Sequence, residues 1–301
     1  MPRTAGGLRT DTTSRLSQLE QQRPEWQAWI RLLAIAQQAS QDDDSSTAPD
    51  DPDLTPGSSG SPDDTPLLHR RSLHADLSGI HRLVERLAAV TSSESVEGGT
   101  SLHQYRPSEA EALDLVSAAL VLDNDGLQAL AEERSLDPGA LATVAHLAAY
   151  PLLQSCGRQL QSSVSPSWQH GYCPVCAAWP ILAERRGLDR SRRLRCGRCS
   201  TQWEVPWLYC IYCGERNHER LGTLEAEGQG EVLKVETCAT CKGYLKSIAT
   251  LQGFPALELL LQDLETVEFD LVALDRGFTR PRDRGFVLEL QIIDRASRRT
   301  L

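Results

Sequence analysis

The stretch CPVCAAWPILAERRGLDRSRRLRCGRC, residues 173–199, carries two CxxC pairs separated by 19 residues. A second stretch, residues 210–241, begins with CIYC, ends with CATC and separates its pairs by 24 residues. A tetrahedral ion takes four sulfurs, and two CxxC turns at such spacings supply them in zinc ribbons. Consecutive pairs close the shorter loops and so lose the least chain entropy. The sequence therefore predicts two four-sulfur sites, the first from Cys173, Cys176, Cys196 and Cys199 and the second from Cys210, Cys213, Cys238 and Cys241.

Other uses of cysteine fit this pattern less well. The chain opens with MPRTAGGLRT and shows no apolar signal-peptide core, which disfavours a disulfide scaffold made for an oxidising compartment. A thioredoxin-like dithiol needs a βαβ pattern around its CxxC pair, and none surrounds these pairs. The ninth cysteine, Cys156, lies in the helix-like LLQSCGRQL and is expected to be a small buried apolar group.

The four-sulfur pattern leaves the metal open. Thiolate tetrahedra suit zinc and rubredoxin-type iron equally, so we expect two four-thiolate ions, iron or zinc. Four thiolates fill the coordination sphere, which disfavours a Lewis-acid zinc enzyme. The turn after the second cysteine needs a positive φ, for which glycine is best suited. Gly214 fills that position after the third pair, whereas Ala177 and Ser200 should adopt it with local strain.

The net charge of −10 is unevenly placed along the chain. Residues 1–170 carry 12 Lys/Arg against 23 Asp/Glu, a net −11, whereas residues 171–301 carry 19 against 18, a net +1. The acidic half disfavours a general nucleic-acid binder, because neutralisation of phosphates dominates that kind of affinity. No apolar run approaches the roughly 18 residues of a membrane span, so we expect a cytoplasmic protein without one.

Shifts in composition predict the fold class α+β: an N-terminal α-helical domain, two rubredoxin-like or zinc-ribbon-like four-cysteine modules and a C-terminal helix. The expected segments are a helical segment 1–39, a disordered acidic linker 40–66, a helical domain 67–167, metal ribbons 168–205 and 206–254, a helix 255–278 and a tail 279–301. The linker holds eight aspartates and no aromatic residue, so it cannot bury enough apolar surface to offset the entropy of ordering.

Local signals place the helix boundaries. Pro24 should interrupt the first helical pattern, and a second pattern runs from Leu67 to about Val90. Ser108 with Glu111 forms a capping-box signature, and Asp137 before a proline marks the next helix start.

The order of these parts, closed by a leucine-rich helix that ends in GFTR, resembles the bacterial formate dehydrogenase accessory protein family, FdhE. The most specific string is ETCATCKGYLK, residues 236–246. CPVC at 173–176, RLRCGRCSTQW at 193–203, CIYCG at 210–214 and DLETVEFDLVALDRGFTR at 263–280 are also similar. The detailed similarity covers about residues 168–280. The chain departs from the family at Ala177 and Ser200, where glycine is usual, in the long acidic insertion and in the extended tail.

The resemblance implies a role in the assembly of molybdenum- or tungsten-dependent formate dehydrogenase. The protein would bind the immature catalytic subunit in the cytoplasm, and its four-sulfur sites would resemble those of rubredoxins in being able to hold iron. The resemblance implies no enzymatic turnover. The residues agree with this, because the chain contains no nucleophile elbow, phosphate loop or HExxH motif.

Arginine and aromatic side chains exposed around rigid ribbons would be anchors for a protein partner. We therefore expect partner contacts at Arg190, Arg192, Arg193, Trp203, Tyr244 and Lys246. Seven arginines between Arg185 and Arg198 leave a nucleic-acid-binding zinc ribbon as one alternative, although the overall charge disfavours it. A rubredoxin-like electron-transfer protein is the other alternative. Whether the chain forms a homodimer is left open.

Overall fold

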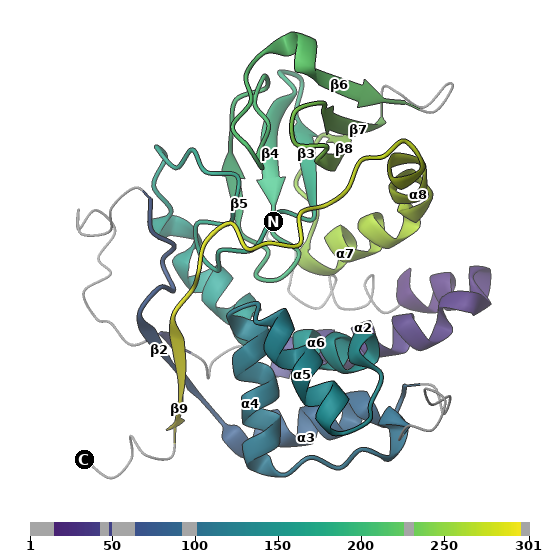
Figure 1. Ribbon diagram of the computed structural model, residues 1–301, viewed down its shortest axis with the longest axis vertical. Coiled ribbons are helices and arrows are strands. Elements are labelled where there is room, and N and C mark those ends of the chain that lie inside the picture. Colours follow the sequence, from purple (N-terminus) through teal and green to yellow (C-terminus); the bar gives the residue numbers. More distant parts are fainter. Residues whose placement is uncertain (1–14, 43–47, 50–63, 92–100, 226–231, 296–301) are drawn as a thin grey trace, which may run out of the picture. The chain divides into compact units, whose positions relative to one another are not determined.

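The computed structural model describes residues 15–42, 48–49, 64–91, 101–225 and 232–295 (Figure 1). The chain splits into two compact units. The first consists of Met1–Asp50, Arg71–Ser155 and Leu290–Leu301, and the second of Asp51–Arg70 and Cys156–Glu289. Helices and strands are both present, together with two clusters of four cysteines, so the predicted α+β class is confirmed.

The first unit is mainly helical. Residues 15–22 form a helix, and Pro24 follows its end, because a proline lacks the N–H that the helix interior requires. A short 3₁₀ helix, Pro24–Trp26, leads into the next helix. The α-helices are α2 (Gln27–Asp42), α3 (Leu77–Ala88), α4 (Glu109–Leu120), α5 (Asn124–Glu133) and α6 (Pro138–Leu160), and 3₁₀ turns lie at Leu102–Gln104 and Gln161–Ser163. The last turn of α6 belongs to the second unit.

The predicted helix starts are confirmed by their caps. At the start of α4, the Glu111 amide donates to Ser108 Oγ at 3.2 Å, and the Ser108 amide donates to Glu111 Oε2 at 2.8 Å. At the start of α6, the Ala140 amide donates to Asp137 Oδ1 at 2.6 Å. Each bond satisfies an amide that has no partner inside the helix.

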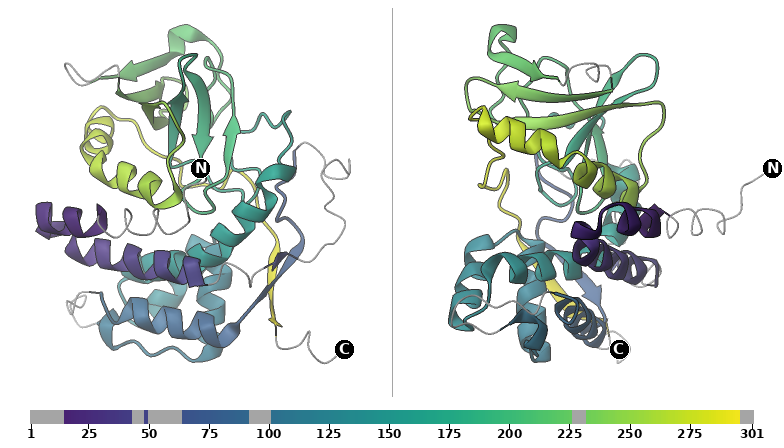
Figure 2. Two further views of the ribbon diagram at one scale, coloured as in Figure 1. Left: turned by 180° about the vertical axis from the view of Figure 1, so that it is seen from behind. Right: turned by 90° about the vertical axis from the view of Figure 1, so that its right-hand side faces the viewer.

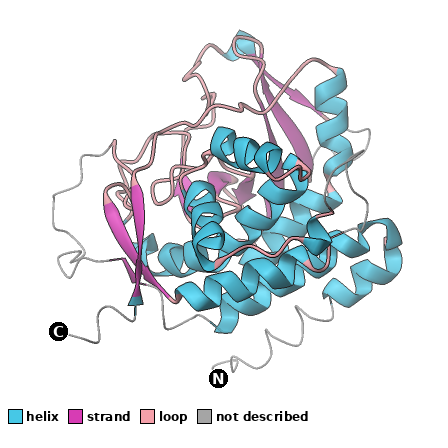
Figure 3. Ribbon diagram, turned by 60° about the horizontal axis from the view of Figure 1, so that its bottom comes forward, coloured by secondary structure: helices cyan, strands magenta, loops and turns pink. Residues whose placement is uncertain are grey.

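The expected helix over residues 67–90 is wrong in its first part, because Arg71–Ala75 forms strand β2. β2 pairs in parallel with β9 (Leu290–Asp294), which lies in the expected tail, and Figure 3 shows the two side by side. The short strand β1 (Ala48–Pro49) pairs with the other edge of β2. Leu73 and Leu77 are four residues apart and therefore resemble a helical repeat. Strand β9, with which β2 pairs, lies far from β2 in the sequence, so no local pattern predicts the pairing.

The second unit contains one six-stranded sheet. Its strands are β3 (Leu182–Arg186), β4 (Ser191–Arg195), β5 (Gln202–Glu204), β6 (Leu221–Leu224), β7 (Leu233–Cys238) and β8 (Tyr244–Thr250). The order across the sheet is β5-β4-β3-β8-β7-β6. Neighbouring strands are antiparallel except β3 and β8, which pair in parallel. The two expected ribbons therefore share one sheet, each contributing three consecutive strands. A 3₁₀ turn at His218–Arg220 precedes β6.

Two helices, α7 (Ala256–Glu265) and α8 (Val267–Asp275), cover one face of this sheet (Figure 2). Leu259 of α7 packs with Leu182 and Ile248, and Ala273 of α8 packs with Val235 and Tyr244. Alternate residues of the strands point to this face, as the two-residue period of a strand requires.

The prediction of one helix over residues 255–278 is wrong, because the helix breaks at Thr266, where φ is −106° and ψ is 20°. Side chains take over the carbonyls that the next helical turn would use. Thr266 Oγ1 donates to the Gln262 carbonyl at 2.6 Å, and Lys246 Nζ donates to the Asp263 carbonyl at 2.7 Å. The lysine comes from β8, so the break depends on a tertiary contact.

Most of the acidic segment 40–66 lies outside the described residues, and the prediction that it is disordered falls there. Among the helices of the described ranges, none combines the length and the apolar character that a bilayer crossing requires.

Candidate metal centres

The eight paired cysteines gather in two groups of four, and within each group the sulfurs lie within 4.8 Å of one another. The first centre combines Cys173 and Cys176, before β3, with Cys196 and Cys199, between β4 and β5. Sγ–Sγ distances are 3.5 Å from Cys173 to Cys199 and 3.5 Å from Cys176 to Cys196. All four side chains are buried.

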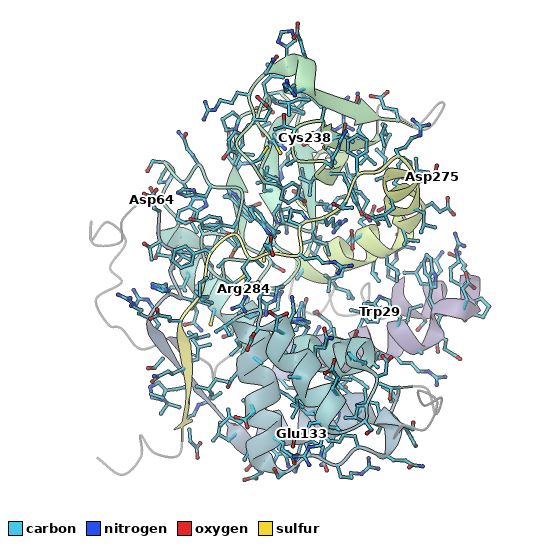
Figure 4. The ribbon with its side chains drawn as sticks, viewed as in Figure 1. Trp29, Asp64, Glu133, Cys238, Asp275 and Arg284 are labelled. Atoms are coloured by element: carbon cyan, nitrogen blue, oxygen red, sulfur yellow. The ribbon has the colours of Figure 1, made fainter. Side chains whose placement is uncertain are left out.

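The second centre combines Cys210 and Cys213, before β6, with Cys238 at the end of β7 and Cys241 between β7 and β8. Figure 4 labels Cys238, the last residue of β7. Its Sγ lies 3.8 Å from that of Cys213, and the sulfurs of Cys210 and Cys241 are 3.6 Å apart. The predicted grouping of consecutive pairs is therefore confirmed.

The sulfurs fit an ion in geometry as well as in number. A tetrahedral ion with metal–sulfur bonds of ~2.3 Å places its ligands ~3.8 Å apart, and the Sγ–Sγ distances of 3.5–3.8 Å are close to this. Both zinc and iron accept this geometry and these soft ligands. Cys156, by contrast, is buried in α6 and belongs to neither group.

All four CxxC turns share one backbone conformation. The residue after the second cysteine has a positive φ each time: 63° at Ala177, 60° at Ser200, 76° at Gly214 and 59° at Lys242. In the first three turns its amide donates to the carbonyl of the first cysteine at 2.9–3.0 Å. A residue with a Cβ costs on the order of 1–2 kcal/mol in this conformation. The strain expected at Ala177 and Ser200 is therefore present, and Lys242 carries it too, which we did not expect.

Burial raises the pKa of several of these thiols, whereas hydrogen bonds from neighbouring residues outweigh burial and lower the pKa of Cys196 and Cys238. Burial raises the pKa of the Cys210 thiol, and it raises the pKa of Cys241 to about 11. In the first centre, burial also raises the pKa of Cys173 and of Cys199. At neutral pH the thiols with a raised pKa are protonated without an ion, and a bound ion requires thiolates.

Metal binding should therefore release protons, and the apparent affinity should fall as the pH falls. We expect the affinity of the metal-free chain for Zn²⁺ to increase steadily between about pH 6 and pH 8. Calorimetric titrations in two buffers of different ionisation enthalpy give the number of protons released at each pH. An affinity independent of pH, with no proton release, would contradict the raised pKa of these thiols.

The structure places the six expected partner residues very differently. Arg190 is exposed in the β3–β4 turn, and Arg193 is partly exposed beside Glu204, with 3.1 Å between Arg193 Nη2 and Glu204 Oε2. The remaining four are buried and do not form part of the surface: Arg192, Trp203, Tyr244 and Lys246. The sequence predicts them as exposed anchors for a protein partner, and their burial contradicts that exposure.

Arg192 instead fixes the connection between the two ribbons. Its guanidinium donates to the carbonyls of Pro206 at 2.9 Å and Tyr209 at 3.3 Å, and it pairs with Glu236 of β7. Trp203 fixes the segment before the first CxxC turn, because its Nε1 donates to the His170 carbonyl at 3.0 Å. Both residues link segments that lie far apart in the sequence, so no local motif reveals the contacts.

Lys246 forms the centre of a buried charge network beside the second centre. Its Nζ lies 2.7 Å from Asp263 Oδ1 and 2.6 Å from Asp270 Oδ2. Arg280 Nη2 approaches the same two carboxylates at 3.2 and 3.0 Å, and Tyr244 Oη donates to Asp270 Oδ1 at 2.9 Å. Burial opposes the charge of Arg280, but Asp263 and Asp270 hold its pKa above the ordinary value. Two cations thus balance two carboxylates. The sequence signal for this was a lysine in an apolar strand, which we interpreted as a surface residue.

A cavity of about 240 Å³ lies on the sheet face that carries Arg192 and Glu236. Cys210 and Cys238 of the second centre form part of its wall. Trp207 and Leu208 also line it, with 49% and 59% of their surfaces exposed. Trp207 lines a second hollow as well, of about 620 Å³, which Arg193 borders. We call the exposed side chains of Trp207, Leu208 and Arg193 the Trp207 surface.

Comparison with known proteins locates the similarity in this half of the chain. Residues 208–286 match the FdhE C-terminal domain. The FdhE homolog of Stutzerimonas stutzeri is 36% identical over 111 residues, which is 36% of this chain and 35% of that protein. The FdhE protein of Escherichia coli O127:H6 is 31% identical over 124 residues, or 40% of this chain and 38% of that one. These alignments span less than half the length of the relatives.

The fold similarity extends further. The crystal structure of the FdhE protein from Pseudomonas aeruginosa matches 92% of this chain and 94% of that chain, with a TM-score of 0.54 and 22% sequence identity. That identity shows a shared fold. This chain is therefore similar to FdhE proteins in sequence over residues 208–286, and it is similar in fold to the FdhE protein from Pseudomonas aeruginosa.

Proposed function

We propose that this chain is an accessory protein for the assembly of formate dehydrogenase and that it binds the immature catalytic subunit of that enzyme in the cytoplasm. The FdhE-like C-terminal domain supports this proposal. The chemistry of the centres supports a binding role over turnover, because four thiolates leave an ion without an open position for a substrate. The ions, iron or zinc, would then hold the ribbons rigid.

The single observation that best supports a protein partner is the Trp207 surface. An exposed tryptophan and leucine beside two hollows are the features of a binding hot spot, in which a few aromatic and arginine residues dominate the affinity. We propose that the catalytic subunit docks here, with Arg193 at the edge. The buried residues Arg192, Trp203, Tyr244 and Lys246 do not contact the partner in this proposal.

Substitution of Trp207 and Leu208 tests this docking surface. Trp207→Ala with Leu208→Ser should weaken binding of the catalytic subunit at least about tenfold, because truncation of a hot-spot residue typically costs ~2 kcal/mol or more. Arg193→Glu should weaken it by a smaller factor. A calorimetric titration or a quantitative pull-down with the purified subunit gives the affinities.

Matched controls make this result specific. Leu188→Ser removes a side chain that is 95% exposed at the β3–β4 turn, and deletion of residues 42–64 removes most of the acidic segment. Both variants should bind like the original chain. If neither the original chain nor the controls bind the subunit, the proposed function is wrong. If the variant with Trp207→Ala and Leu208→Ser binds as well as the original chain and the controls, the docking surface is elsewhere.

The nucleic-acid alternative loses its main support in the fold. Arg185, Arg192 and Arg195 are buried, and the last two pair with Glu236 and Glu184. The arginine run therefore does not form a continuous basic surface of the kind that phosphate binding requires.

A further inference from the structure

The two centres have the same ligands but differ in their access to solvent. In the first centre, none of the four cysteines exposes more than 1% of its surface. In the second centre, Cys210 and Cys238 are buried, whereas Cys213 and Cys241 are exposed. Each CxxC turn of the second centre therefore has one buried and one exposed cysteine.

Segments from outside the ribbon seal the first centre. The amides of Leu67 and Leu68 donate to the carbonyls of Pro174 and Val175 at 2.7 and 3.1 Å, which covers the first CxxC turn. The end of α6 covers the second turn, where Gly157 lies so close that an added Cβ would be 1.9 Å from the Cys199 carbonyl oxygen. An incoming ligand can reach this centre only after such a segment opens.

The second centre is covered on one side only. Gly171 packs against Ile211 so closely that an added Cβ would lie 1.8 Å from the Ile211 carbonyl oxygen, which shields the Cys210 side. On the other side, among the described residues, the turn at Lys242 contacts a segment of the chain that follows α8. The Thr279 amide donates to the Lys242 carbonyl at 2.8 Å, and the Tyr244 amide donates to the Thr279 carbonyl at 3.3 Å. These contacts fix the backbone and leave the residues Cys213 and Cys241 exposed.

We propose that the second centre is an exchangeable metal site, at which external ligands attack through Cys213 and Cys241, whereas the first centre holds its ion permanently. Exchange of a metal–thiolate ion begins when a competing ligand or proton reaches the ion or a sulfur. Exposed sulfurs allow this directly, and buried sulfurs require local unfolding, which is a rare event in a packed region.

Occupancy of the second centre is also linked to the segment after α8. Lys242, next to the ligand Cys241, and Tyr244 hold one side of the Thr279 pairing, and Arg280 next to Thr279 joins the Lys246 network that fastens α8 to β8. Further along, the Asp283 carbonyl accepts from Trp179 Nε1 at 2.8 Å. Loss of the ion frees the turn at Lys242, and the Thr279 pairing should then weaken. Binding of the ion at the second centre therefore orders the segment around Thr279, and loss of the ion loosens it.

Zinc release from the full-length, zinc-loaded chain tests the exchange. With an excess of a chromogenic chelator, one ion per chain should leave quickly and the other at least about 100-fold more slowly. Cys213→Ser should abolish the fast phase and leave the slow ion in place, whereas the matched variant Cys176→Ser should abolish the slow phase. Release of both ions in one phase would overturn the proposal.

Two measurements on the unaltered chain keep the test valid if a variant does not fold. Brief treatment with iodoacetamide, followed by peptide mapping, should modify Cys213 and Cys241 before any cysteine of the first centre. Hydrogen exchange measured after the fast ion has left should show faster exchange at the Thr279 and Tyr244 amides. The Leu67 and Leu68 amides serve as the control and should remain protected. Modification of the first centre first would overturn the assignment of the open site, and unchanged exchange at Thr279 would overturn the coupling.

Discussion

Lys246→Met should lower the free energy of unfolding of the metal-loaded chain by about 3–5 kcal/mol. The ammonium group is fully buried and contacts Asp263 and Asp270 at 2.7 and 2.6 Å. Methionine has a similar length but no charge, so two partly buried carboxylates would remain against Arg280 alone. Removing one partner of a buried ion pair costs far more than the pair itself contributes, because the remaining charge is left without compensation. Denaturation by urea with both ions bound gives the change.

Lys234→Met is the matched control for this prediction. Lys234 lies on the neighbouring strand β7, and its Nζ contacts Glu225 Oε1 at 2.7 Å, but this pair is partly exposed. Its loss should cost no more than about 1 kcal/mol, the usual value for an ion pair at the surface. Adding Asp270→Asn to Lys246→Met should restore part of the lost stability, because it removes one of the uncompensated charges. Equal effects of Lys246→Met and Lys234→Met would mean that the network is accessible to water.

Gly157→Ala should destabilise the chain by about 3 kcal/mol or more, although alanine is the better helix former. Gly157 lies in α6, and a Cβ there would be 1.9 Å from the Cys199 carbonyl oxygen and 2.9 Å from its carbon. These are backbone atoms of a metal-binding turn, so the clash displaces either the helix or the first centre. We expect lower thermal stability together with a loss of about one zinc ion per chain.

Gly139→Ala, in the first turn of the same helix, should not lower the stability of the chain as Gly157→Ala does. There an added Cβ would meet only Asp137 Oδ1, at 3.4 Å, which is close to ordinary contact. The substitution should be neutral or stabilising by up to about 1 kcal/mol, through the higher helix propensity of alanine. If Gly157→Ala were as mild as Gly139→Ala, the end of α6 would not pack against Cys199 and the first centre would be less sealed than we describe.

The sequence predicted the parts of this protein whose rules are local. CxxC spacing identified the two ligand sets, and the capping signature at Ser108 and Glu111 identified the start of α4. In both cases a few neighbouring residues determine the geometry, because a turn or a cap closes its bonds within four or five positions. The identity of the metal is not a local property of four thiolates, and the same set of sulfurs accepts iron or zinc.

The parts that were missed depend on contacts between distant segments. The last helical segment breaks at Thr266 because Lys246, which lies on strand β8, donates a hydrogen bond to the Asp263 carbonyl. Arg192 is buried because the segment at Pro206 and Tyr209 folds back over it. From composition alone, a lysine or an arginine is expected at the surface, and only the arrangement of its partners places it inside.

The short outer strands β5 and β6 limit how far the six-stranded sheet can grow. Each ribbon repeats the same order of parts: a CxxC turn, two strands, a second CxxC turn and a third strand. The first strand of one ribbon pairs with the third strand of the other, which is a head-to-tail contact, and such contacts do not close on themselves. The two outer strands, β5 and β6, are therefore complementary in kind and, in principle, would allow chains to polymerise through their sheets. β5 has only three residues and β6 has four, whereas β8 has seven. Short outer strands offer few backbone hydrogen bonds to another chain. The length of β5 and β6 therefore disfavours growth of a fibre through the sheets.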